Sequence, residues 1–303
     1  MKRFQSILCC VNDPDQPDPA LHRAVALAKS NGAELTLAAA DHSGLHFWQS
    51  ESLQRAIATR RIEQLDELAR RLREPGLDVS TTVLNGNPAA SIIEEVTNVG
   101  HDLVLKTSRA ESLATRLFFG ETAIRLMRRC PCPVWILQPQ HSELRRILAA
   151  VDADATDAPH VALNRQVVEM AASLAESEQC ELQLAYVIPE FRDSALVPRD
   201  YREQLNDMRR DAIVETTSAV TELLTATGVK LPAKRIHQVS GVPGEALSLF
   251  AKREHVDLIV MGTITRPGLD DFVIGNTAET VLHSVECSVL AVKPAGSAVA
   301  VAG

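Results

Sequence analysis

Short apolar runs alternate along this chain with longer stretches whose apolar residues recur every three or four positions. In the second half, ILAAV at 147–151 and LIVMG at 258–262 are unbroken runs, whereas Val167, Met170 and Leu174 follow the spacing of a helix. Unbroken apolar runs are typical of parallel strands that are buried on both faces. The pattern therefore predicts an α/β protein in which helices cover both faces of a mostly parallel sheet.

Five strand-like runs fall in the second half, with helical stretches between them. The longest helical stretch extends from about Pro198 to Ala226 and ends at Gly228, and Pro243 is well placed for the first turn of a later helix. An open, five-stranded sheet is therefore expected for this half. The five runs lie at 145–151, 181–188, 233–239, 256–262 and 287–294.

The two halves of the chain resemble each other. ILCCVND at 7–13 matches ILAAVDA at 147–153, and DLVLKTS at 102–108 matches DLIVMGT at 257–263. The separation between matched residues grows from 140 to 155, so the second copy carries additional residues in its first half. We interpret this as a duplication, with the same five-stranded α/β domain formed twice. The two predicted domains span residues 1–140 and 141–303.

Composition narrows the range of partners. The chain has 303 residues, of which 46% are hydrophobic and 23% are charged, and its formal net charge is −8. This charge argues against binding to nucleic acid or to an anionic membrane surface. Two Trp and two Tyr residues are too few for a base-stacking platform, and no apolar run has the length of a membrane span. The N-terminal residues lead directly into a strand, so a cytoplasmic protein is expected.

The cysteine and histidine residues give little indication of a redox, metal-binding or catalytic site. The six cysteines are scattered, and those in apolar runs are expected to pack in the core of a protein from a reducing compartment. The stretch DHSGLH at 41–46 could in principle bind a metal, but one polar loop is weak evidence, and we predict no metal site. Motifs for a nucleophile elbow, a phosphate-binding P-loop or a zinc protease are missing from the sequence, so no catalytic residue is assigned.

Polar and glycine residues gather where the strands of the second half end. Asp152 directly follows one strand, where a carboxylate can accept hydrogen bonds from a ligand or cap the following turn; position alone leaves both roles open. Gly262 ends another strand and would let a ligand approach the backbone. Gly275, Asn276 and Thr277 precede or begin a helix, whose free N–H groups suit an anion. In parallel sheets, ligands bind at this edge.

Several stretches carry a family resemblance that covers nearly all of the chain. HDLVLK at 101–106, RRCPCPVW at 128–135, MGT at 261–263 and GNTAETVL at 275–282 resemble universal stress proteins of the UspA type. The whole chain is similar to the tandem, two-domain members of that family. The resemblance implies a Rossmann-like fold of the adenine nucleotide alpha hydrolase-like kind for each domain.

Family members that bind ATP carry the pattern G-x2-G-x9-G-(S/T), with an aspartate after the first strand near the adenine. On this sequence, Gly262 and Gly275 match the first and third glycines, whereas Thr265 replaces the second and Asn276 replaces the Ser/Thr. Thr265 adds a side chain where the backbone would lie against phosphate. The resemblance implies an adenine nucleotide, with no metal beyond the Mg²⁺ that accompanies it, in the C-terminal domain only. The implied contacts are Asp152, Val187, Met261, Gly262, Gly275, Asn276 and Thr277.

The first half departs further from the same pattern. Asn12 replaces the aspartate, and Thr107 and Ala110 replace the first two glycines. Glu121, which follows Gly120, would repel a triphosphate. We therefore expect no nucleotide site in the first domain, which would serve as a packing partner or hold an apolar pocket.

The expected function is stress-linked regulation through a small-molecule ligand, without enzymatic activity apart from slow ATP hydrolysis. The two domains are expected to pack as an intramolecular pseudo-dimer, with association into a homodimer and the protein partners left open. Two alternatives remain from the residues themselves. One is a carrier of an apolar or lipid-like molecule, which a large pocket lined by Ala, Val and Leu would favour. The other is a scaffold without a nucleotide.

Overall fold

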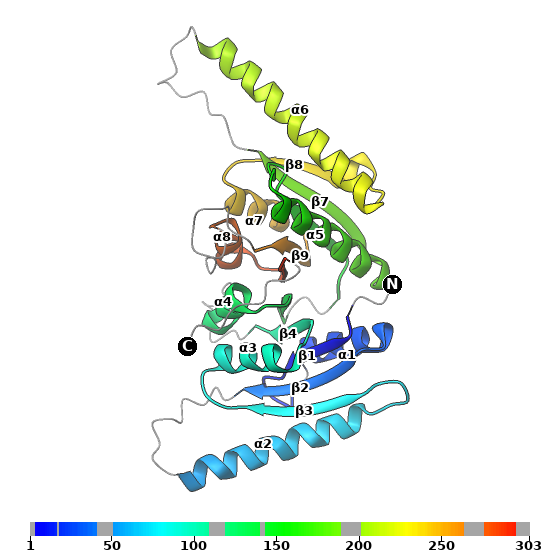
Figure 1. Cartoon of the computed structure of the whole chain (residues 1–303), viewed down its shortest axis with the longest axis vertical. Coiled ribbons are helices and arrows are strands. Elements are labelled where there is room, and N and C mark those ends of the chain that lie inside the picture. The colour runs from blue at the N-terminus through cyan, green and yellow to red at the C-terminus, as the bar shows by residue number, and fades with distance from the viewer. Residues whose placement is uncertain are drawn as a thin grey trace. The chain divides into compact units, whose positions relative to one another are not determined.

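The structure is a computed structural model of the whole chain, and it divides into two compact units (Figure 1). The first unit contains Met1–Ser142 together with Ser288–Gly303, and the second contains Glu143–Cys287. The residues that the structure describes are 4–16, 18–40, 51–108, 119–139, 143–188, 201–263 and 276–294.

The first unit alternates strands and helices as the sequence predicts. Its strand order is β3-β2-β1-β4-β5-β10, and β1 to β5 pair in parallel. The long helix α2 packs against β3 (Figure 1). The elements are β1 (Ser6–Cys10), α1 (Pro19–Asn31), β2 (Glu34–Ala40), α2 (Glu51–Leu72), β3 (Val79–Leu84), α3 (Pro88–Val99), β4 (Leu103–Thr107), α4 (Gly120–Arg129), β5 (Val134–Leu137) and β10 (Ser288–Val292).

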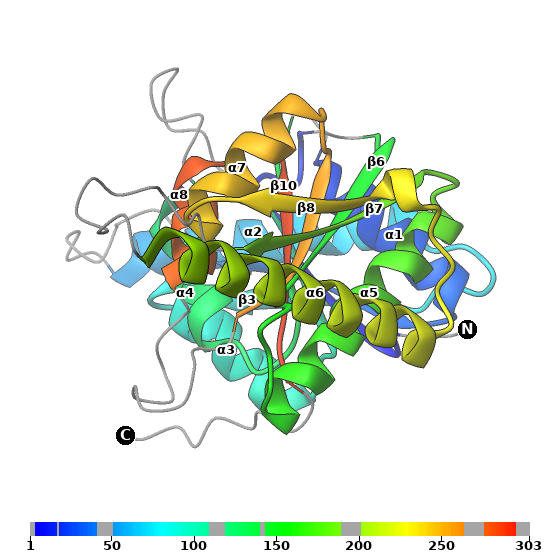
Figure 2. The ribbon, with the colours of Figure 1, turned by 90° about the horizontal axis from the view of Figure 1, so that it is seen from above.

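The second unit repeats this arrangement with the parallel strand order β9-β6-β7-β8. Helices α5 and α6 pack against each other, as do α7 and α8 (Figure 2). The elements are β6 (Arg146–Val151), α5 (Ala158–Ser177), β7 (Glu181–Ile188), α6 (Arg202–Thr227), a 3-10 turn η3 (Ala233–Arg235), β8 (Ile236–Ser240), α7 (Pro243–Arg253), β9 (Leu258–Gly262) and α8 (Asn276–Ser284).

Strand β10 belongs to the second sequence repeat but lies in the first unit. It pairs antiparallel with β5, with Leu290 opposite Trp135. Beyond the strand, Lys293 Nζ donates hydrogen bonds of 2.6 and 3.1 Å to the carbonyl oxygens of Met127 and Arg128, at the C-terminal end of α4. A cation is favoured there by the helix dipole. The last strands of the two repeats thus cover each other's hydrogen-bonding edge, and the expected five strands per unit become six and four among the described residues.

Helix α5 carries part of the predicted insertion. It has 20 residues, whereas α1 has 13. The C-terminal ends of the two helices are equivalent, because Ala33 donates to Ala28 in one repeat and Cys180 donates to Ala175 in the other, just before the next strand. The additional residues, about two turns, therefore lie at the N-terminal end of α5. That end meets the carboxyl ends of the strands, where a ligand is expected.

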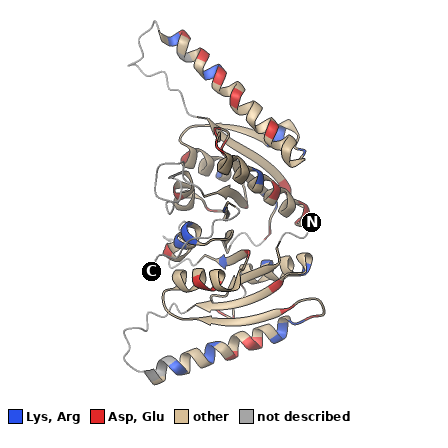
Figure 3. Ribbon diagram, in the orientation of Figure 1, with Lys and Arg blue, Asp and Glu red and all other residues tan. Residues whose placement is uncertain are grey.

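The cysteines pack in the core, as the sequence predicts. All six cysteines are free, and five of them are buried. Burial raises the pKa of Cys10 and of Cys287 to about 12, so these thiols are inert packing groups. Both signs of charge alternate along α2 and α6 (Figure 3), and Arg70 pairs with Glu67 on the exposed face of α2. Each helix in the described part of the chain is too short or too polar to cross a membrane.

Candidate functional site

Three of the predicted site residues lie at one edge of the second unit's sheet. In the parallel register, Val151 of β6 is opposite Tyr186 of β7, and Ala150 of β6 is opposite Met261 of β9. The next residue along each strand is therefore Asp152, Val187 or Gly262. The fold brings the carboxyl ends of β6, β7 and β9 together, as expected for the ligand edge of a parallel sheet.

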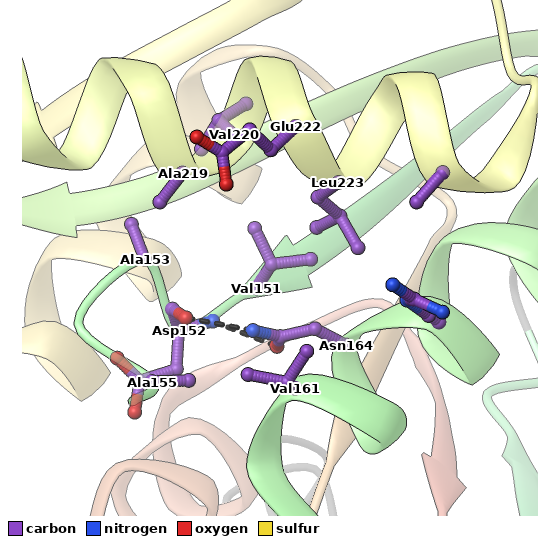
Figure 4. A pocket seen from close by; sticks show the side chains of 12 residues that line it. Val151, Asp152, Ala153, Ala155, Val161, Asn164, Ala219, Val220, Glu222 and Leu223 are labelled. Carbon is purple, nitrogen blue, oxygen red and sulfur yellow. Dashed lines mark hydrogen bonds between the residues drawn. The ribbon is translucent and has the colours of Figure 1, made fainter. Parts of the chain in front are cut away.

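The main chain of Asp152 is held by Asn164 from the second turn of α5. The Asp152 N–H donates to Asn164 Oδ1 at 3.1 Å, and Asn164 Nδ2 donates to the Asp152 carbonyl oxygen at 2.7 Å (Figure 4). One carboxylate oxygen of Asp152 accepts a hydrogen bond from the N–H of Asp154 at 3.1 Å. The carboxylate therefore caps the turn that follows β6, which is one of the two roles that the sequence left open.

A pocket of about 150 Å³ lies beside Asp152, between α5 and α6. Figure 4 shows its apolar side chains converging from three elements: Val151 at the end of β6, Val161 on α5 and Leu223 on α6. Asn164 and the exposed Arg165 add polar groups from α5. The other lining residues are Asp152, Ala153, Ala155, Ala219, Val220, Glu222 and Ala226. The pocket therefore combines apolar side chains with polar groups from α5, from α6 and from the end of β6.

Gly262 has a packing explanation. A Cβ atom at this position would lie 2.4 Å from Leu163 Cδ2 and 2.8 Å from Leu163 Cγ. Its backbone is not in the left-handed region, so no turn geometry requires glycine here. The Leu163 side chain takes the space that a side chain at this position would need, so packing accounts for the glycine. The approach of a ligand to this backbone stays a prediction.

The structure describes some, but not all, of the other residues predicted to contact a nucleotide. Met261 is buried and Val187 is half-buried, and neither lines the pocket between α5 and α6. Asn276 begins α8, and Thr277 is half-buried in its first turn. Gly275 lies outside the described residues. So do Thr265, Ala110 and the loop 41–46.

Sequence reasoning missed a histidine in the first turn of α5. Asp157 caps this helix: its Oδ1 accepts from the His160 N–H at 3.1 Å and lies 2.8 Å from His160 Nδ1. The side-chain hydrogen bond from His160 is the main reason why the pKa of Asp157 is lowered. His160 Nε2 is buried and has no hydrogen-bond partner among the described residues. The signal was available, since DAPH at 157–160 has the spacing of a cap with a polar residue three positions later.

At the carboxyl edge of the first unit's sheet, the side chains hydrogen-bond to one another and to nearby main-chain groups. Asn12, at the position of Asp152, donates from Nδ2 to the Thr107 carbonyl oxygen at 3.0 Å and accepts from Lys106 Nζ at 2.7 Å. Thr107, at the position of Gly262, donates its hydroxyl to the Asp18 carboxylate and accepts from the N–H of Ala20 at 3.1 Å. Here the side chains at the strand ends satisfy one another rather than facing an open pocket.

Within the described ranges, no group of three or more His, Cys, Asp or Glu side chains is placed so that it could hold a metal ion.

Glu121, the carboxylate expected to repel a phosphate in the first unit, lies in the first turn of α4. It pairs with Arg125 at 2.5 Å.

Comparison with known proteins identifies the family of the chain. The model of the universal stress protein family matches it twice, over residues 3–138 and 143–293. Universal stress protein E of Escherichia coli strain K12 is 28% identical, over 97% of this chain and 95% of the relative. Its namesake in Photorhabdus laumondii is 27% identical, over 98% and 97% of the two chains.

Solved structures agree with the fold. A structure from Pseudomonas aeruginosa matches with a TM-score of 0.76 and 25% identity, and covers 97% of this chain and 94% of that one. A universal stress protein from Archaeoglobus fulgidus matches with a TM-score of 0.64 and 17% identity, over 96% and 97% of the two chains, which supports the fold alone. With both halves matched by one family model, the chain belongs to the universal stress protein family, as a member that carries two such domains in tandem.

Proposed function

We propose that this chain is a ligand-sensing regulatory protein of the stress response and that its second unit binds an adenine nucleotide. The observation that carries the proposal is the pocket beside Asp152, at the carboxyl end of β6, where parallel α/β sheets bind their ligands. Membership of the universal stress protein family supports it, because ATP-binding members place an aspartate at this strand end. The first unit has an asparagine there, bonded within its own edge.

The pocket suits a nucleobase. A cavity of about 150 Å³ accommodates a ring of roughly benzene size, so part of the base would enter and the rest of the nucleotide would remain outside. Val151, Val161 and Leu223 offer apolar contacts to the faces of such a ring. Asp152, whose carboxylate caps the turn after β6, lines the same pocket and would lie beside the base.

A carrier of lipid-like molecules fits this pocket less well. Its lining does contain Ala, Val and Leu side chains, as that alternative requires. Its volume of about 150 Å³, however, is below the 300–1,000 Å³ or so of sites for drug-sized ligands. An acyl chain would need more room, so the nucleotide is the better proposal.

No residue at this edge has been assigned as a general base for catalysis, so any hydrolysis of ATP would be slow.

Mass spectrometry of released ligands and calorimetry test the proposal. The protein is purified without added ligand and denatured, and the released small molecules are identified; recovery of ATP or ADP is expected. In titrations with ATP, Leu223→Trp should fill the pocket and weaken binding at least tenfold. Leu249→Trp is the matched control, because Leu249 is 70% exposed on α7 and lies outside the pocket.

Two results would contradict the proposal. If the wild type binds no adenine nucleotide, a scaffold becomes the better description. If Leu223→Trp and Leu249→Trp bind ATP as tightly as the wild type, a nucleotide binds elsewhere.

A further inference from the structure

Glu222 is a carboxylate of the pocket whose capacity to accept hydrogen bonds is largely unused. It lies on α6 and lines the pocket together with its neighbour Leu223. Figure 4 shows its carboxylate on the side of α6 that faces Val151. The residue is exposed, so a ligand in the pocket can reach it. Its Oε1 accepts from Ser218 Oγ at the long distance of 3.4 Å, and its Oε2 accepts no hydrogen bond from the described residues.

The other polar side chains that line the pocket are engaged or are of the wrong kind. The carboxylate of Asp152 caps the turn after β6 by accepting from the N–H of Asp154. Asn164 uses both its Oδ1 and its Nδ2 to hold the main chain of Asp152. Arg165 can only donate hydrogen bonds. Glu222 is therefore the side chain of the pocket that is best able to accept a hydrogen bond from a ligand.

The charge of Glu222 is not compensated by a basic neighbour. Arg165 on α5 lines the same pocket, yet the two side chains form no ion pair with each other in the described part of the chain. Hydrogen bonds to an ionised acceptor are stronger than those between neutral groups. A ligand that presents a donor to Glu222 is therefore favoured over one that presents an acceptor or an apolar edge.

The amino group of adenine is a donor of this kind. It projects from the edge of the base, where it carries two N–H groups. Leu223 offers an apolar contact to the face of a ring in the pocket, and the adjacent Glu222 offers an acceptor to its edge. We propose that Glu222 accepts a hydrogen bond from the amino group of the bound adenine. This inference rests on the proposed function and adds to it a residue that selects the base.

Purine riboside triphosphate tests the inference, because it is ATP without the amino group. Binding of the two ligands is measured by calorimetry at about pH 7, where an ordinary carboxylate is ionised. The wild type should bind ATP about threefold to tenfold more tightly than the analogue, as expected for one hydrogen bond. In Glu222→Met, which lacks the acceptor, the two ligands should bind with equal affinity. Glu222→Gln keeps a carbonyl oxygen and should retain part of the preference.

The matched control is Glu203→Met in the first turn of α6. Glu203 is exposed and lies outside the pocket, and its distance from Glu222 along the helix is about 30 Å. This variant removes the same charge from the same helix. It should keep the wild-type preference for ATP, which separates loss of the acceptor from a change in charge.

Each outcome has one meaning for the inference. Equal affinity of the wild type for ATP and the analogue overturns the inference and leaves the proposed function standing. So does a full preference for ATP in Glu222→Met, or loss of the preference in Glu203→Met. If the wild type binds neither ligand, the inference and the proposed function both fail.

Discussion

The two units share the same parallel α/β arrangement but differ at the carboxyl edges of their sheets. In the first unit, Asn12, Thr107 and Asp18 bond to one another and to neighbouring main-chain groups. In the second unit, Gly262 has no side chain to bond, and the ring of His160 keeps one nitrogen unpaired among the described residues. One duplicated framework therefore supports both an edge whose side chains hydrogen-bond to one another and an edge that borders a pocket.

The length of one helix accounts for much of this difference. Helix α1 begins close to the strand ends, so its cap Asp18 and its first N–H groups bond directly to Thr107. Helix α5 is longer at this end, and its cap Asp157 bonds to His160 instead. The extension also contributes Val161 and Asn164 to the pocket. An insertion at a strand edge can thus accompany the change from a packed edge to one with a pocket.

Breaking the bonded edge of the first unit should have the largest effect. Asp18→Ala removes the cap of α1 and the partner of the buried Thr107 hydroxyl, so we expect a loss of about 2–4 kcal/mol in the free energy of unfolding. Urea denaturation measures this loss. Asn87→Ala is the control, since it removes an exposed cap of α3 and should cost only about 1 kcal/mol. Equal losses in the two variants would show that the network adds nothing to the cap.

Adding a side chain at Gly262 makes the second edge more like the first. Gly262→Ala should lower stability by about 1–3 kcal/mol, because its Cβ would overlap Leu163. In a Leu163→Ala background the same substitution should cost much less, and a double-mutant cycle by urea denaturation measures the coupling. An unchanged cost in that background would mean that Leu163 is not the reason for the glycine.

A smaller effect is expected where Asn164 holds the end of β6. Asn164→Asp keeps the shape of the side chain but loses the donor to the Asp152 carbonyl oxygen, and should cost about 1 kcal/mol. It should also weaken ATP binding, because Asp152 would no longer be held. A variant with wild-type stability and affinity would show that these hydrogen bonds do not order the site.

The smallest effect concerns pH. The pKa of Asp157 is lowered in the folded state, chiefly by the hydrogen bond from His160. Its contribution to stability is therefore fully present above the unfolded pKa of about 3.9 and is lost as the pH falls through the lower, folded value. Urea midpoints between pH 5 and pH 2 should fall more steeply for the wild type than for His160→Met. If the two proteins show the same dependence on pH, the hydrogen bond between Asp157 and His160 does not contribute to stability.

How far the sequence could predict the site depends on the kind of contact. The strand ends at Asp152, Val187 and Gly262 could be found, because a strand boundary is a local signal and parallel strands share an edge. The role of Leu163 could not, because it depends on how closely α5 approaches β9. The helix cap at DAPH could have been found from the sequence, but the burial of His160 could not, because it depends on how α5 packs.

The sequence by itself determined the class of fold, the duplication, the order of strands and helices, and the family. These follow from periodicity and from internal matches, which report the burial of each element separately. The tertiary structure decided that β10 pairs with β5 in the first unit, that Gly262 receives Leu163, and that His160 is buried with one free nitrogen among the described residues. These contacts join residues from different elements or depend on how those elements pack, and no local pattern along the chain encodes such distances.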